Sequence, residues 1–143
     1  MAYDHGQYQV IFPSGMSVTA SGDQFAWTPG YMPHIVRAVG VVFTASGIVT
    51  SGLVLAFTKN TMVSGGPASS DVAVLTGPSG TAALLSGSVL YKDGLNNKVT
   101  PGQKVTINVR AAVTGTTQRA RAFLWVEPTW ETPANNTTMV ASS

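Results

Sequence analysis

The chain has 143 residues, of which only 10% are charged (8 Lys+Arg and 6 Asp+Glu), against about 25% in an ordinary soluble domain. It has no Cys, which excludes disulfides, thiolate metal sites and Cys nucleophiles. The net charge of +2 comes from scattered basic residues and is not typical of a nucleic-acid-binding protein. Fifteen Gly and 30 Ser and Thr take the place of the missing charges. Such a surface repels neighbours weakly and suits burial in a large assembly.

Short apolar runs separated by Gly, Pro, Ser and Asn clusters predict about eight strands. They are Gln7–Phe12, Gln24–Thr28, His34–Thr44, Leu53–Asn60, Asp71–Leu75, Ser88–Lys92, Lys104–Val113 and Gln118–Glu127. The most apolar window, residues 35–57, is interrupted by Arg37 and several Ser, Thr and Gly, which indicates two buried strands and not a membrane helix. The only helix candidate is Thr81–Leu85. The pattern predicts an all-β, antiparallel two-sheet sandwich, jelly-roll-like.

The clearest element is a predicted C-terminal hairpin. Its first strand alternates Val105, Ile107 and Val109 with polar residues, and Ala120, Ala122, Leu124 and Val126 repeat an apolar face after the turn at Thr114–Thr117. If Val113 pairs with Gln118, the opposed residues are Arg110 with Arg121 (Arg119 lying diagonally), Asn108 with Phe123, and Thr106 with Trp125.

Two facing arginines and two large aromatics are unfavourable on a face that simply meets water. One interpretation is that the register is shifted or that a loop covers this face. The other is a contact surface whose acids come from a partner or a second copy, with Glu127 and Glu131 as candidate acids within the chain.

The expected organisation is a single domain with extended ends. Residues 1–30 form an N-terminal arm and entry strands, residues 31–128 the sandwich body, and residues 129–143 a polar C-terminal tail. The ends either pack on the chain's own body or run over neighbouring subunits. The beginning of the chain has no basic segment before an apolar core, so no secretory signal is expected.

No catalytic, cofactor-binding or metal-binding residue is predicted. Asp4 and His5 are adjacent but lack spaced partner ligands, and His34 is the only other histidine. The six carboxylates are scattered, so no glycosidase pair is expected, and the Ser-rich turns lack the context of a nucleophile elbow. Trp27, Trp125 and Trp130 are candidates for a sugar-stacking platform, although core or interface aromatics are commoner.

The candidate interface residues combine aromatic and apolar anchors with the arginines of the predicted hairpin. They are Tyr3, Tyr8, Phe12, Arg110, Arg119, Arg121, Phe123, Trp125, Trp130 and Met139. Deleting residues 1–12 is predicted to leave a folded domain that no longer binds its partner.

The segment from Val99 to Val109 begins with a Thr-Pro-Gly turn that feeds a penultimate strand. With its size, β patterning and uncharged loops, the chain resembles small structural proteins of tailed-phage virions, in particular head decoration (cement) proteins. The resemblance implies a non-catalytic protein of the capsid surface, needing no cofactor. It would assemble as a homo-oligomer, a trimer being favoured, and bind the major capsid protein to brace adjacent capsomers. Alternatives are a tail or head-fibre component and a carbohydrate-binding β-sandwich module.

Overall fold

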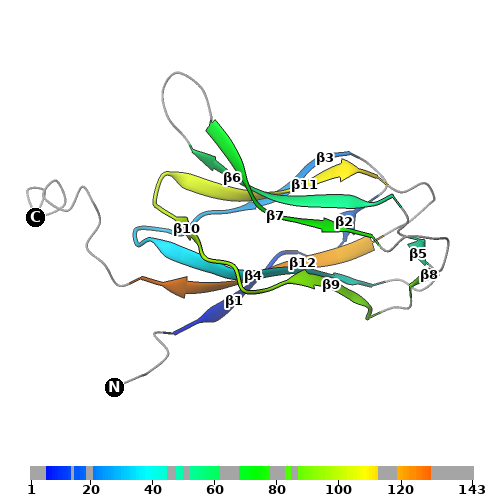
Figure 1. Cartoon of the computed structure of the whole chain (residues 1–143), viewed down its shortest axis with the longest axis horizontal. Helices are drawn as coiled ribbons and strands as arrows, with labels where there is room; N and C mark the ends of the chain where they lie inside the picture. The colour runs from blue at the N-terminus through cyan, green and yellow to red at the C-terminus, as the bar shows by residue number, and fades with distance from the viewer. Residues whose placement is uncertain are drawn as a thin grey trace, which may run out of the picture.

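The computed structural model is a β-sandwich of two antiparallel sheets, without helices among the residues that it describes (Figure 1). These residues are 6–13, 15–18, 21–44, 48–49, 52–61, 68–77, 83–84, 87–112 and 119–129. The all-β prediction is confirmed, and each of the eight predicted strands is present within a few residues of its expected bounds.

Sheet A contains six strands: β1 (Tyr8–Ile11), β2 (Met16–Ser17), β4 (His34–Phe43), β9 (Val89–Lys92), β10 (Asn97–Val99) and β12 (Arg119–Pro128). Sheet B contains four: β3 (Gly22–Trp27), β6 (Val54–Thr61), β7 (Ala68–Thr76) and β11 (Gln103–Ala111). A separate short pair, β5 (Ile48–Val49) with β8 (Ala83–Leu84), lies at one end and includes part of the segment considered as a helix candidate.

The strand order is that of a jelly roll. β1 and β2 both pair with β12 and share one position in sheet A, while β9 and β10 both pair with β4 and share another. If each of these pairs counts as one strand and the short β5–β8 pair is set aside, the sandwich has eight strands numbered along the chain. Sheet A then has the order first (β1 and β2), eighth (β12), third (β4) and sixth (β9 and β10). Sheet B has the order second (β3), seventh (β11), fourth (β6) and fifth (β7). Chain-neighbouring strands therefore mostly lie in opposite sheets, as in two interlocked Greek keys.

The predicted C-terminal hairpin is wrong. β11 pairs with β3 and β6 in sheet B, whereas β12 pairs with β1, β2 and β4 in sheet A. The proposed oppositions of Arg110 with Arg121, Asn108 with Phe123 and Thr106 with Trp125 do not occur. The alternation identified correctly which side of each strand is buried, but two strands that face each other across a core have the same alternation as two strands side by side.

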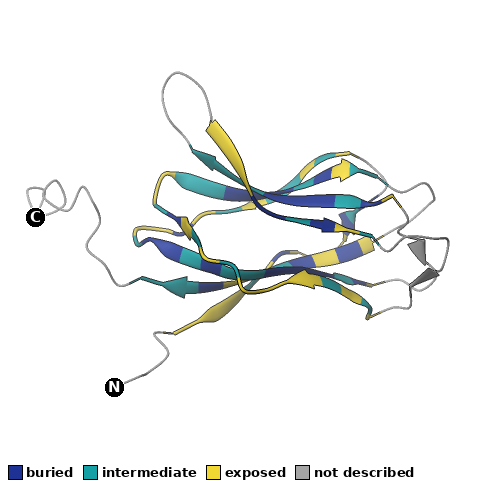
Figure 2. Ribbon diagram, viewed as in Figure 1, coloured by how far each residue is buried: buried dark blue, intermediate teal, exposed yellow. Residues whose placement is uncertain are grey.

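The core lies between the sheets and consists of alternate residues from both (Figure 2). Its largest fully buried side chains include Phe43 and Leu124 from sheet A and Leu55, Phe57 and Ile107 from sheet B. Their burial removes apolar surface from water, at roughly 25 cal/mol per Å².

A β-bulge at Arg37 lets two residues of β4, Val36 and Val39, both point into the core. The β4–β12 register passes from Ala38 opposite Trp125 to Val36 opposite Val126, leaving Arg37 as the extra residue. Val36 and Val39 are three residues apart, so strict alternation would expose one of them, yet both are fully buried. The bulge turns the Arg37 side chain outward, where it binds Glu127.

The first strand belongs to the sandwich. β1 pairs with β12, the Phe12 amide donates to the Ala122 carbonyl at 3.0 Å, and the Phe12 ring stacks on Phe25 at a centroid distance of 6.3 Å. Deleting residues 1–12 would therefore remove an edge strand and a core aromatic, contrary to the expectation of an intact fold.

Phe12 and its neighbour Ile11 test this placement. We expect Phe12→Ala to lower the free energy of unfolding by about 3 kcal/mol or more, because it leaves a cavity in the core. Ile11→Ala on the exposed side of the same strand should cost less than about 1 kcal/mol. Urea denaturation followed by tryptophan fluorescence measures both. Equal effects of the two substitutions would contradict the placement of Phe12 in the core.

Candidate functional site

The outer face of sheet A carries a continuous apolar surface. In the strand register, Ile11 of β1 lies opposite Phe123 of β12, Phe123 lies opposite Gly40 of β4, and Gly40 lies opposite Tyr91 of β9. This cross-strand row runs the full width of the sheet. One step along the strands, Val42 and Val89 form a second apolar pair on one side of the row.

Several of these residues are well exposed to solvent, and most of β1 and β9 is coloured as exposed in Figure 2. The exposed fractions are 57% for Ile11, 64% for Tyr91, 44% for Val89 and 40% for Trp125. We call the sheet A face the surface formed by Ile11, Val42, Val89, Tyr91, Phe123 and Trp125. Exposed apolar side chains gathered on one face are typical of an interaction surface.

Gly40 forms a seat for the Phe123 ring. A Cβ atom built on Gly40 would lie 2.2 Å from Cζ of Phe123 and under 3.0 Å from two further ring carbons. The ring therefore lies directly across the Gly40 backbone, in the manner of an aromatic residue that covers a strand glycine. This flattens the middle of the sheet A face, since the Phe123 ring lies down on Gly40, which has no side chain.

Charged groups lie at both ends of the same face. At one end, Arg119 donates from Nη1 to the Gly15 carbonyl at 2.9 Å. The Arg121 side chain beside it makes no hydrogen bond or ion pair with any other described residue. At the other end, Nη2 of Arg37 lies 2.7 Å from Oε2 of Glu127.

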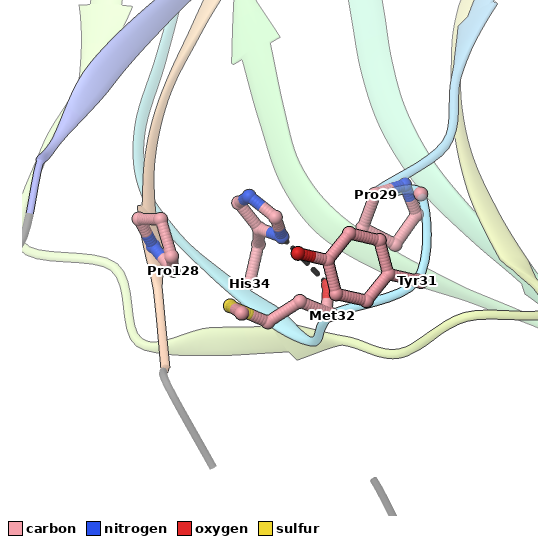
Figure 3. A pocket seen from close by; sticks show the side chains of 6 residues that line it. Pro29, Tyr31, Met32, His34 and Pro128 are labelled. Carbon is pink, nitrogen blue, oxygen red and sulfur yellow. Dashed lines mark hydrogen bonds between the residues drawn. The ribbon is translucent and has the colours of Figure 1, made fainter. Parts of the chain in front are cut away.

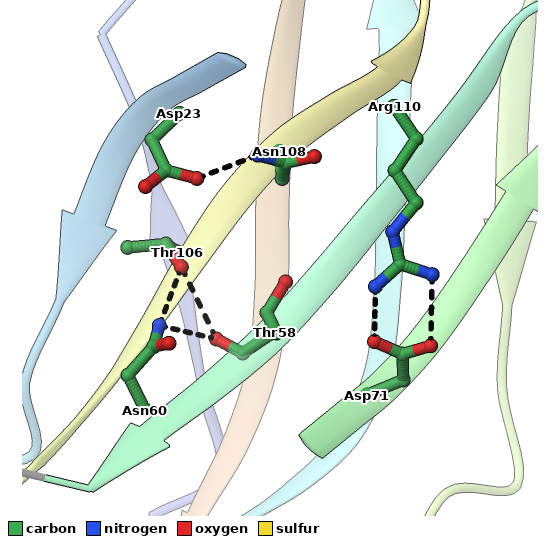
Figure 4. Close-up of polar contacts among 7 residues, drawn as sticks. All are labelled: Asp23, Thr58, Asn60, Asp71, Thr106, Asn108 and Arg110. Atoms are coloured by element: carbon green, nitrogen blue, oxygen red, sulfur yellow. Dashed lines mark hydrogen bonds and ion pairs between the residues drawn. The ribbon is translucent and has the colours of Figure 1, made fainter. Parts of the chain in front are cut away.

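The outer face of sheet B is polar and satisfies itself (Figure 4). Asn60 Nδ2 donates to Oγ1 of Thr106 at 2.7 Å, and Asn108 Nδ2 donates to Oδ1 of Asp23 at 2.7 Å. Arg110 forms a two-pronged ion pair with Asp71 across β6. Hydrogen bonding to Arg110 holds the pKa of the Asp71 carboxyl below its usual range. The two outer faces therefore differ in kind, because the polar side chains of sheet B bond to one another, whereas sheet A exposes apolar side chains.

His34 is a structural histidine at one end of the sandwich. Its Nδ1 lies 2.8 Å from the Met32 carbonyl, which only accepts, so Nδ1 carries a proton and donates. In the neutral ring Nε2 must then accept, and it does so from the Tyr8 hydroxyl at 2.8 Å. Partial burial raises the pKa of the Tyr8 phenol, which keeps this donor protonated. With the Trp27 indole packed edge-on against it, the imidazole has no nitrogen left for a metal or substrate.

Beside His34 is a small, mostly apolar pocket lined by Pro29, Tyr31, Met32 and Pro128 (Figure 3). In this view the His34 imidazole bonds to the Met32 backbone carbonyl, and the Tyr31 side chain lines the same pocket. The pocket contains no second titratable partner for His34 among its lining residues other than the Tyr31 phenol. Its composition supports packing and offers no acid–base pair.

A shallow depression of about 520 Å³ lies beside Trp125 on the outer side of sheet A. Ala38 and Gly94 form small parts of its wall, and Arg37, Asp93 and Asn96 bring polar groups to it. Arg37 Nη1 donates to Oδ1 of Asn96 at 3.0 Å. An exposed indole next to such groups is suited to packing against a flat or cationic group.

The structure gathers four of the ten predicted interface residues on one surface. Arg119, Arg121, Phe123 and Trp125 all point outward from β12. Arg110 lies instead on sheet B, bound to Asp71, and Phe12 lies in the core. Tyr8 lies at the edge, bonded to His34.

The remaining predicted residues are Tyr3, Trp130 and Met139, which lie outside the described residues, as do His5 and Glu131. Of the three candidates for a sugar-stacking platform, Trp27 and Trp125 lie apart: half-buried Trp27 contacts His34 at the sandwich end, while Trp125 faces out of sheet A.

Sequence reasoning missed Ile11, Val42, Val89 and Tyr91, which complete the sheet A face, and Gly40, on which the Phe123 ring lies. The alternation of Val89 and Tyr91 in a short predicted strand was a usable signal of a common side. Their position beside Phe123 depends on pairing between strands that are distant in the sequence, and no local pattern contains it.

Within the described ranges, no group of three or more His, Cys, Asp or Glu side chains is placed to hold a metal ion. The described residues also contain no helix of the length and apolar character needed to cross a membrane. No protein-family model, no curated protein and no solved structure matches the chain. Function is therefore inferred from its own residues and geometry.

The contact between Gly40 and Phe123 gives a test with a change of sign. We expect Gly40→Ala to destabilise the protein by about 1 kcal/mol, because the new methyl group displaces the ring from its seat. In a Phe123→Ala background, the same substitution should become neutral or stabilising by up to about 1 kcal/mol, since Ala is favoured over Gly in a strand. A double-mutant cycle by chemical denaturation measures the coupling. A Gly40→Ala cost that is unchanged in the two backgrounds would show that the ring does not lie on Gly40.

Proposed function

We propose that the chain is a non-catalytic structural protein of a virus particle, and in particular a decoration protein on the outside of a tailed-phage head. The observation that carries the proposal is the difference between the two outer faces. The sheet A face exposes apolar side chains across four strand positions, whereas sheet B pairs its polar groups internally. A single apolar face on a rigid sandwich suits a subunit that is held between neighbours.

The fold supports the same conclusion by analogy. Jelly rolls occur in viral capsid proteins, but also in lectins and other proteins, so the fold alone does not decide the function. The low charge adds a physical reason, because 14 charged residues in 143 leave little repulsion between crowded copies.

The proposal also accounts for the chemistry of the described residues. His34 has both ring nitrogens bonded, and Asp71 and Glu127 are bound to arginines. These groups hold the fold together and are poorly placed to bind or activate a substrate.

Incorporation into particles tests this function. The chain should be an abundant component of purified virions of the virus that encodes it, measured by quantitative mass spectrometry. A particle carrying the Ile11→Ser/Tyr91→Ser variant should hold about tenfold fewer copies, because two apolar anchors of the sheet A face are lost. The matched control Thr58→Ser/Asn108→Ser, on the outer face of sheet B, should be incorporated normally.

Gold-labelled antibody seen by electron microscopy should mark the head. Labelling of the tail or of fibres would show that the chain is a tail or head-fibre component and not a decoration protein. Absence of the chain from purified virions would overturn the proposal.

The Trp125 depression favours carbohydrate binding as a second candidate function. An indole beside the Arg37, Asp93 and Asn96 side chains offers a stacking surface and hydrogen-bonding groups, which together are suited to a sugar ring. We expect any glycan that binds on an array to be lost on Trp125→Ala and retained on Trp27→Ala, because Trp27 contacts His34 and not this depression. An array without a hit, or loss on Trp27→Ala alone, would remove this candidate.

A further inference from the structure

We infer that the sheet A face is a homotypic contact, in which two copies of the chain pack face to face about a two-fold axis. The inference rests on the proposed function, because it takes the sheet A face as the contact surface and names the neighbour that covers it. The neighbour is a second copy of this chain, and the evidence is the order of side chains along β12.

The outward residues of β12 are arranged so that, when two copies of the strand lie antiparallel, each residue faces one of complementary chemistry. In chain order they are Arg119, Arg121, Phe123, Trp125 and Glu127. Phe123 is the midpoint, with a cation two positions before it and an exposed indole two positions after it. A further two positions away, a second cation and a carboxylate stand at opposite ends.

A two-fold axis along the row from Ile11 to Tyr91 would place each of these β12 residues opposite a complementary residue of the second copy. Such an axis runs across the strands and lays β12 of one copy antiparallel over β12 of the other. Arg121 of each copy then lies over Trp125 of the other, and Arg119 lies toward Glu127. This is an isologous arrangement, in which residue i contacts residue j and residue j contacts residue i.

The pairing of Arg121 with Trp125 provides a partner for each of two groups that the single chain leaves exposed. The Arg121 guanidinium has no hydrogen-bonding or ionic partner among the described residues, and Trp125 is 40% exposed. A guanidinium over an indole ring is the favoured form of a cation–π contact, and it strengthens when water is excluded. The two-fold axis would form this contact twice.

The middle of the face is shaped for close approach. The Phe123 ring lies down on Gly40, so no bulky side chain stands up at the crossing point. Ile11 and Tyr91, at the two ends of the row, would each meet the corresponding side chain of the second copy near the axis. Two sheets packed in this way would follow the aligned geometry of β-sandwiches, at a separation of about 10 Å.

The available area is sufficient for a specific dimer. Four strand positions at a spacing of about 4.8 Å, and ten residues of β12 at about 3.4 Å each, give a face of about 650 Å² per copy. The total of about 1,300 Å² is at the lower end of stable protein interfaces. The expected product is a closed dimer of moderate affinity, and not the trimer that the family resemblance implies.

Sedimentation equilibrium of the full-length chain over the micromolar to millimolar range tests the inference. We expect a monomer–dimer equilibrium with no larger species. Arg121→Glu and Trp125→Ala should each raise the dissociation constant by about tenfold or more, because each removes two contacts per dimer. Arg110→Gln is the matched control, an arginine on the outer face of sheet B, and should leave the constant unchanged. Circular dichroism and thermal denaturation confirm that each variant is folded.

The sharpest variant exchanges the two residues. In an isologous contact, R121W/W125R in one chain rebuilds both pairs with the roles reversed, so the double exchange should recover most of the affinity that R121W or W125R loses alone. A contact that is not two-fold through this face would not be rescued. A chain that stays monomeric throughout, or a dimer insensitive to Arg121→Glu, overturns the inference.

The two proposals fail in distinguishable ways. A monomeric chain whose incorporation into virions still depends on Ile11 and Tyr91 would disprove the dimer and keep the structural function. A chain that dimerises through Arg121 and Trp125 but is absent from virions would keep the dimer and disprove that function.

Discussion

The pairing of β12 with β4 is the interaction on which the rest of the structure depends. β12 is an inner strand of sheet A, bonded along most of its length to β4 on one side and to β1 and β2 on the other. Its even-numbered residues from Ala120 to Val126 are fully buried, so strand alternation must direct the odd-numbered ones outward. The same register that builds the core therefore fixes which side chains the outer face displays, and in what order.

Two local departures from regular geometry adapt this sheet. The bulge at Arg37 lets Val36 and Val39 share the core and sends a guanidinium outward to Glu127. The absence of a side chain at Gly40 lets the Phe123 ring lie flat across β4. Both occur on β4, directly beside the outward row of β12. One sets the polar end of the face and the other keeps its centre level, so the shape of the proposed contact surface follows from details of a single strand.

The two outer faces show how a weakly charged protein can still be specific. On sheet B, hydrogen bonds and the ion pair of Arg110 with Asp71 occupy polar groups of the outer face, so these groups are not available to a partner. On sheet A, few polar groups intervene between the aromatic and aliphatic side chains, and the arginines at one end have no acidic partner among the described residues. Partner choice then depends on where a small number of charges stand around an apolar centre, which is how charge contributes to specificity in interfaces.

The sequence by itself determined the β class, the eight main strands and the buried side of most of them, because alternation is a local property that each strand carries in its own residues. It also singled out Arg119, Arg121, Phe123 and Trp125 as unusual for a water-facing surface. Only the tertiary structure decided that β11 and β12 lie in opposite sheets, that Arg110 is separated from the other arginines, and that Ile11, Gly40 and Tyr91 complete the row. Strand pairing is set by the packing of both sheets around one core, a property of the whole chain that no local segment encodes.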